Sequence, residues 1–155
     1  MHHTLPYTLA KAYCATEFRV FHRQQCLRFY AGRPHNGLGQ LLGELNTPYA
    51  ALITAYSPYS QTLLPAQNAH AQAKLYGALE GRWRYLDAEG ADPTGQWPAE
   101  PSLLVLSIPL WRAQLLGRTF GQHALVWLQR GNAPRLVATE SANQPLLDAA
   151  QRASR

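Results

Sequence analysis

Apolar residues along the first third of the chain change their spacing several times, and each spacing predicts a different element. Within residues 6–15 they recur every three or four positions, which is typical of a short amphipathic helix. In residues 17–22 they alternate with polar residues, and a second apolar run at 26–30 follows closely, so we predict a β-hairpin. The glycine-rich segment 32–43 predicts a loop, with a short helix where leucines continue towards Leu45.

The middle of the chain holds the strongest strand pattern and the longest helical pattern. Residues 49–55 are apolar and lie between two prolines, which favours a strand covered on both faces. Residues 65–80 have helical spacing, begin with a proline and are followed by Gly81, a typical helix stop. The spacing predicts that this helix packs on a sheet through one face, which comprises Ala69, Ala73, Tyr76 and Leu79.

The last part of the chain alternates strands with connections. We predict strands at 82–86 and 102–108 with a loop at 87–98 between them, a short helix at 110–116, and a final hairpin from 124–129 and 135–138. Two hairpins that flank strand–helix–strand passages favour an α+β fold, with a mixed, largely antiparallel sheet and helices packed on it. We expect a single domain over residues 1–140 and a C-terminal tail with a loose helix over 141–155.

Composition changes this picture little, but it restricts the class of protein. A chain of 155 residues with 46% hydrophobic residues has the size and apolar content of one folded domain. Its apolar runs are too short for a membrane span and its N-terminus lacks a signal-peptide pattern, so we expect a cytoplasmic protein without membrane contact. The net charge of +5 comes mostly from scattered arginines, which favours a solvated basic surface over a nucleic-acid patch.

The cysteines, histidines and glycines of the sequence match none of the common catalytic or cofactor patterns. Cys14 and Cys26 lack the spacing of a zinc site, and a single bridge would not make a disulfide scaffold, so we expect two free buried thiols. The sequence contains no metal-binding histidine pair, no serine nucleophile motif and no phosphate-binding glycine loop. We therefore expect no metal and no nucleotide cofactor, and the sequence assigns no reaction.

The segment that follows the predicted central strand is unusually polar and leads into the long helix. Thr54, Ser57 and Ser60 lie in this segment, and Asn68 lies in the helix. Strand ends and helix starts are common ligand sites, because free backbone N–H groups there attract anions and neutral side chains add hydrogen bonds. The same side chains fit a bracing role equally well, in which they satisfy backbone groups of the turn and of the helix end.

Four short motifs resemble one family in their order and separation. They are Thr-Ala-Tyr-Ser-Pro-Tyr-Ser at 54–60, Gln-Asn at 67–68, Trp-Pro-Ala-Glu-Pro-Ser at 97–102 and Phe-Gly-Gln at 120–122. Together they resemble a bacterial family catalogued as domain of unknown function 3293, over roughly residues 13–137. The resemblance implies site residues but no established activity.

Two positions depart from the pattern of that family. Asparagine is usual where this chain has Ser57, and glutamate is usual where it has Gln67. If the glutamate of relatives acts as a base, Gln67 cannot replace it, whereas a hydrogen-bonding role survives the change. The departures therefore favour ligand binding or a bracing role over acid–base catalysis in the 54–68 segment.

Two further motif residues complete the predicted site. Glu100 either orients or activates a ligand, or it has a structural role, for example in an ion pair with Arg118. Gln122 either faces the same cavity as Thr54 or braces its own turn. The residues that we predict to bind a ligand are Thr54, Tyr56, Ser57, Ser60, Asn68, Glu100, Ser102 and Gln122.

The sequence thus supports two functional hypotheses. In the first, a small polar or anionic ligand binds between the 54–68 segment and the strands that carry Glu100 and Gln122. In the second, a basic module binds RNA or an acidic protein through arginines beside aromatic residues, because strand alternation would place Arg82 and Arg84 on one face. Affinity for a nucleic acid should fall steeply as salt rises, which separates the second hypothesis from the first.

Overall fold

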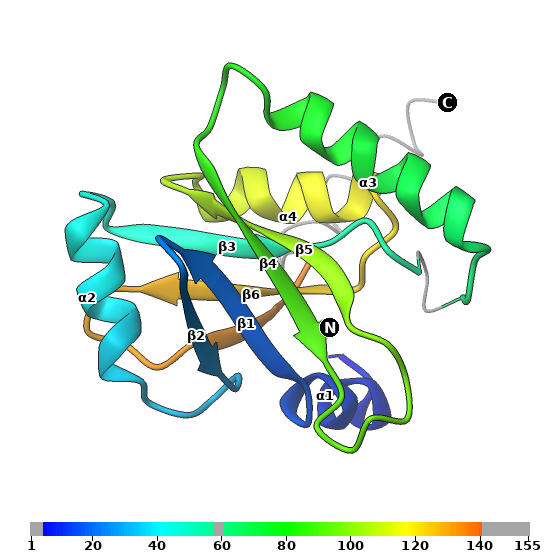
Figure 1. The fold of residues 1–155 in the computed structure, drawn as a ribbon, viewed down its shortest axis with the longest axis horizontal. Coiled ribbons are helices and arrows are strands. Elements are labelled where there is room, and N and C mark those ends of the chain that lie inside the picture. The colour runs from blue at the N-terminus through cyan, green and yellow to red at the C-terminus, as the bar shows by residue number, and fades with distance from the viewer. Residues whose placement is uncertain (1–4, 58–60, 141–155) are drawn as a thin grey trace, which may run out of the picture.

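The predicted central strand lies inside a curled seven-stranded sheet, with neighbours on both sides (Figure 1). The computed structural model describes residues 5–57 and 61–140. Strand β3 (Tyr49–Ile53) pairs with β5 (Glu100–Leu106) on one side and with β6 (Ala124–Gln129) on the other. The order is β2-β1-β4-β5-β3-β6-β7, and all six of these pairings are antiparallel. The predicted α+β fold with a largely antiparallel sheet is therefore confirmed, whereas the predicted tail at 141–155 lies outside the described residues.

Both predicted hairpins form at the outer sides of this sheet. Strands β1 (Glu17–His22) and β2 (Gln25–Phe29) are joined by Arg23 and Gln24, whose φ angles are 49° and 64°. Two consecutive positive φ angles are typical of the tight turns that match the twist of a hairpin. On the opposite side, β6 pairs with β7 (Arg135–Ala138).

Helices cover both faces of the sheet and divide the core into two layers. Helix α2 (Asn36–Glu44) packs on the face of Ala50 and Leu52, and α1 (Tyr7–Cys14) adds Tyr13 to the same layer. Helices α3 (Pro65–Leu79) and α4 (Leu110–Thr119) pack on the other face, against Ala51 and Ile53. The strict alternation along β3 follows from the period of two in a strand. None of the described helices has both the length and the apolar character needed to span a bilayer.

Strand β4 (Tyr85–Ala91) begins later and ends later than the predicted strand at 82–86. The residues 87–91, which we predicted as loop, pair with β1 on one side and with β5 on the other. Pairing on both sides outweighs the weak strand preference of aspartate, glutamate and glycine. Arg82 and Arg84 precede the strand, so the predicted alternation of these arginines on one strand face is wrong; Arg84 donates instead to the Leu45 carbonyl oxygen at 2.9 Å.

The buried face of α3 also differs from the predicted one. Ala69 and Ala73 are exposed, whereas Asn68 and Gln72 are buried together with Leu75 and Leu79. Helical spacing alone assigns apolar residues to the core, but here two polar residues face it because they accept hydrogen bonds from the preceding segment.

The two cysteines are free, as predicted, but both are exposed, so the prediction of buried thiols is wrong. Cys26 lies on the edge strand β2 opposite Phe21, which is itself 39% exposed. Cys14 is the last residue of α1, which has no buried residues. Their position on outward faces explains their exposure better than the average preference of cysteine for the interior.

Candidate functional site

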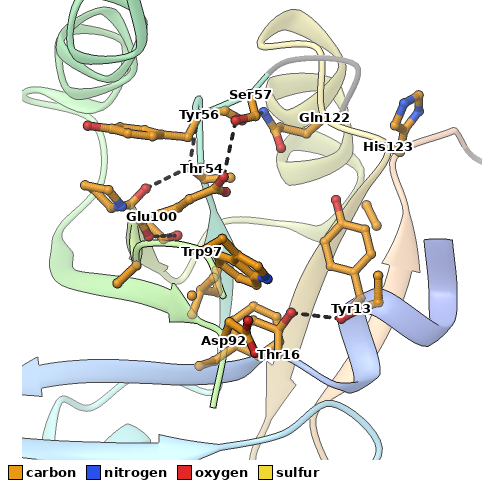
Figure 2. Close-up of a pocket in the computed structure, with 18 of the residues that line it drawn as sticks. Tyr13, Thr16, Thr54, Tyr56, Ser57, Asp92, Trp97, Glu100, Gln122 and His123 are labelled. Atoms are coloured by element: carbon orange, nitrogen blue, oxygen red, sulfur yellow. Dashed lines mark hydrogen bonds between the residues drawn. The ribbon is translucent and has the colours of Figure 1, made fainter. Parts of the chain in front are cut away.

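The antiparallel strand order brings the ends of several strands to one edge of the sheet. There β3 ends, β5 and β6 begin, and α1 lies nearby, so residues distant in sequence surround one cavity of about 990 Å³. Figure 2 shows this cavity with Glu100 and Ser57 on one side and Tyr13 on the other. Seven of the eight predicted site residues line it, and the eighth, Ser60, lies outside the described residues. The seven are Thr54, Tyr56, Ser57, Asn68, Glu100, Ser102 and Gln122.

Three consecutive backbone N–H groups at the cavity donate to side chains. Ala55 N–H donates to Gln72 Oε1 at 3.1 Å, and Ser57 N–H donates to Asn68 Oδ1 at 2.9 Å. Between them, Tyr56 N–H donates to Thr54 Oγ1 at 3.0 Å. Because buried backbone groups need partners, these bonds fix the segment that leaves β3. Thr54 and Asn68 thus line the cavity and brace its wall at the same time.

Gln122 and Ser102 also combine the two roles. The side-chain Nε2 of Gln122 donates to the Tyr56 carbonyl oxygen at 3.0 Å and to the Phe120 carbonyl oxygen at 3.3 Å. The hydroxyl of Ser102 donates to the backbone carbonyl oxygen of Glu100 at 3.3 Å. Gln122 therefore connects the start of β6 to the 54–57 segment, which brings the separated motifs into contact.

Glu100 accepts a hydrogen bond from a residue of another motif. The Ser57 hydroxyl donates to Glu100 Oε1 at 3.2 Å (Figure 2). Burial raises the pKa of the Glu100 carboxyl, and the hydrogen bond from Ser57 offsets part of this increase. The suggested ion pair with Arg118 does not form, since Arg118 donates to the Thr139 carbonyl oxygen. The Glu100 carboxyl therefore holds its proton more firmly than the carboxyl of an exposed glutamate does.

The start of α3 offers less to an anion than the sequence suggested. Pro65 has no N–H group, and the N–H of Leu64 donates to the Gln67 side chain at 3.1 Å. The N–H of Gln67 donates in turn to the Leu64 carbonyl oxygen at 3.0 Å. Gln67 is not among the residues that line the cavity, and it closes half of a capping box. A glutamate could accept the same bond, so a capping role accounts for both residues at this position.

This capping role predicts how substitutions of Gln67 affect stability. We expect Gln67→Ala to lower the free energy of unfolding by about 0.5–1 kcal/mol, because the Leu64 N–H loses its acceptor. Gln67→Glu should match the wild type or exceed it by up to about 1 kcal/mol, since a carboxylate favours a helix start. Urea unfolding at pH 7 measures both. The exposed Gln40 of α2 provides the control, and an equal loss in Gln40→Ala would contradict the capping role.

Several cavity residues were not predicted from sequence. Tyr13 faces the cavity from α1, and burial together with the nearby charge of Glu100 raises its pKa to about 12. Trp97 lies in one of the four motifs but is not among the predicted site residues; it lines the cavity and is 40% exposed. Asp92 and His123 line it as well. Trp97 could have been predicted as a cavity residue from its position in one of the four motifs. For Tyr13 the sequence shows only the helical spacing of its segment, which does not indicate a cavity.

Metal ligands are not grouped in the part of the chain that the structure describes. Within residues 5–57 and 61–140, no three His, Cys, Asp or Glu side chains lie close enough together to hold a metal ion. Asp92 and Glu100 are the described carboxylates of the cavity.

Comparison with known proteins agrees with the family inferred from the four motifs. A family model described as "Protein of unknown function (DUF3293)" matches residues 53–125, just under half of the chain. This segment runs from the end of β3 to the start of β6 and contains all four motifs, but it does not include α1. Neither a curated protein nor a solved structure matches the chain significantly.

Proposed function

We propose that the chain, which belongs to the DUF3293 family, binds a small polar ligand in the cavity beside Glu100. The observation that supports this most directly is the meeting of separate motifs: Ser57 and Glu100 are 43 positions apart in sequence and share a hydrogen bond at the cavity wall. A volume of about 990 Å³ lies in the range that is common for sites of small molecules.

Glu100 is the polar centre of the proposed site. Among the described residues, Ser57 is the one side chain that donates to this carboxylate, and it reaches one of the two oxygens. A carboxylate that is partly withdrawn from water loses hydration, and a hydrogen-bond donor from a ligand would restore it. Thr54, Asn68 and Gln122 then serve mainly to hold the wall in place around that carboxylate.

The raised pKa of Glu100 predicts a stability effect with a defined sign. Because the folded state holds this proton more firmly than the unfolded chain does, the favourable contribution is present at low pH and is lost as pH rises through the folded-state pKa. Glutamine mimics the protonated form, so Glu100→Gln should raise the melting temperature at pH 7 by roughly 1–3 °C and change it little below pH ~4. Scanning calorimetry at both pH values measures this. The exposed Glu44 supplies the control, and a Glu100→Gln protein less stable than the wild type at pH 7 would refute the assignment.

Ligand binding itself is tested by thermal shift. A library of small metabolites at pH 7.5 should contain compounds that stabilise the protein, by about 2.7 kcal/mol at a concentration 100 times the Kd, or roughly 5–11 °C. Ala12 is an exposed residue of α1 that lines the cavity, so the larger side chain of Ala12→Trp should occupy ligand space and abolish the increase in melting temperature. If every active compound shifts the wild type and Ala12→Trp equally, binding occurs elsewhere and the proposal fails.

A further inference from the structure

The charge of the cavity is opposite to the charge of the chain. The sequence carries 14 Lys and Arg against 9 Asp and Glu, a formal net charge of +5. Among the described residues that line the cavity there is no lysine and no arginine, whereas Asp92 and Glu100 are both present. A basic protein that binds an anion would be expected to place at least one of its cations at the site.

Three other described carboxylates have partners that balance or stabilise their charge. Glu17 and Glu89 each bind Arg19, at 2.8 Å and 3.0 Å. Asp92 accepts hydrogen bonds from the Thr94 hydroxyl and from the N–H groups of Thr94 and Gln96, and these bonds lower its pKa. Glu100 accepts a hydrogen bond from the Ser57 hydroxyl and has no lysine or arginine partner among the described residues. Because its carboxyl is partly buried, an opposite charge would stabilise it more than it would stabilise an exposed carboxylate. The missing partner of the cavity is therefore a positive group.

Aromatic residues also line the cavity that contains this carboxylate. Tyr13, Phe18, Tyr56 and Trp97 all line the cavity. In Figure 2, Trp97 lies on the same side as Glu100, and Tyr13 projects from α1 on the other side. Since the pKa of Tyr13 is about 12, its phenol stays neutral at physiological pH and adds no negative charge. Aromatic faces attract cations through their electron density, and they pack well against flat or aliphatic carbon skeletons.

We propose that the ligand is a small organic cation, with its ammonium or guanidinium group at Glu100 and its carbon skeleton between Trp97 and Tyr13. This inference rests on the proposed function and specifies its ligand class. The positive group would donate charge-assisted hydrogen bonds to a carboxylate that has no lysine or arginine partner among the described residues. An anion of the same shape would instead meet Asp92 and Glu100, and the described lining offers no lysine or arginine to offset that repulsion.

The test compares probes that differ in charge but share a skeleton. Tyramine is the cation, tyrosol the neutral alcohol and para-hydroxyphenylacetate the anion; agmatine adds a guanidinium on an aliphatic chain. Isothermal titration at pH 7.5 measures the binding of each to the wild type. We expect tyramine or agmatine to bind at least about tenfold more tightly than tyrosol and para-hydroxyphenylacetate, which corresponds to about 1.4 kcal/mol.

Variants locate the binding and separate the two proposals. Glu100→Gln should weaken the binding of the cation by at least about tenfold, whereas Glu44→Gln should leave it within about twofold. Ala12→Trp should weaken every probe that binds in the cavity. If tyrosol or para-hydroxyphenylacetate binds best and Ala12→Trp removes that binding, the cation inference is overturned while the proposed function stands. If none of the four probes binds, the cation inference is overturned as well, and the metabolite screen decides on the proposed function by itself.

Discussion

Replacing Gln72 with alanine should lower the free energy of unfolding by about 2–4 kcal/mol, or the melting temperature by roughly 5–15 °C. Gln72 is 5% exposed, and its Oε1 accepts a hydrogen bond from the N–H of Ala55, which is fully buried. Truncation removes this acceptor and leaves a cavity under α3. Thermal and urea unfolding of the purified variant measure both effects together.

Gln72→Met separates the hydrogen bond from the volume. Methionine fills nearly the same space and lacks a strong acceptor, and it also removes the Nε2 group of Gln72, which has no partner among the described residues. We expect Gln72→Met to cost roughly 1–2 kcal/mol less than Gln72→Ala, because the volume is kept. An exposed glutamine provides the reference: if Gln72→Ala costs no more than Gln40→Ala, the bond to Ala55 does not support the cavity wall.

Replacing Ser57 with valine should destabilise the protein by about 1–3 kcal/mol, because the backbone at this position has a φ of 46°. Left-handed backbone is costly for β-branched residues, whereas asparagine adopts it several times more readily than most residues. Ser57→Asn should therefore retain the stability of the wild type, and Ser57→Gly should match or exceed it. Urea unfolding of the three variants gives the order.

Ser102→Val provides the matched control for Ser57→Val. It makes the same chemical change in the buried, extended backbone of β5, where β-branched residues are favoured. If both variants lose the same stability, the left-handed conformation of Ser57 does not explain the effect. If the predicted order holds, backbone geometry accounts for the asparagine that the family resemblance implies at this position.

Strong periodicity made most elements of this fold predictable. Strand β1 was predicted from alternation, β3 from a continuous apolar run between two prolines, and α3 from helical spacing. The second half of β4 was missed because Asp87, Glu89 and Gly90 favour loops when judged singly. Their strand conformation depends on pairing with β1 and β5, whose partner residues are ten or more positions away in sequence. Tertiary pairing of this kind leaves no local signal.

The sequence identified residues that meet at one cavity, but not the hydrogen bonds that each of them makes. Seven of the eight residues line the cavity because antiparallel neighbours place the end of β3 beside the starts of β5 and β6. The sequence could not show that three of these side chains also form hydrogen bonds with the backbone, since ligand binding and bracing use the same donors and acceptors. The three are Thr54, Asn68 and Gln122. Gln72 was missed because a glutamine on a helix shows no sign of burial until its acceptor role at Ala55 is known.

The cavity is assembled from two parts of the chain that differ in their relation to the family. Ser57, Glu100 and Gln122 lie inside the matched segment 53–125, whereas Tyr13 and Thr16 come from α1 and the residues after it, outside that segment. On the proposed function, the segment shared with the family would fix where the polar group of a ligand sits. The N-terminal helix would fix the shape of the remainder. Exchange of residues 5–16 between relatives would then transfer their preference for the ligand's carbon skeleton, while the Glu100 carboxylate that binds the polar group stays unchanged.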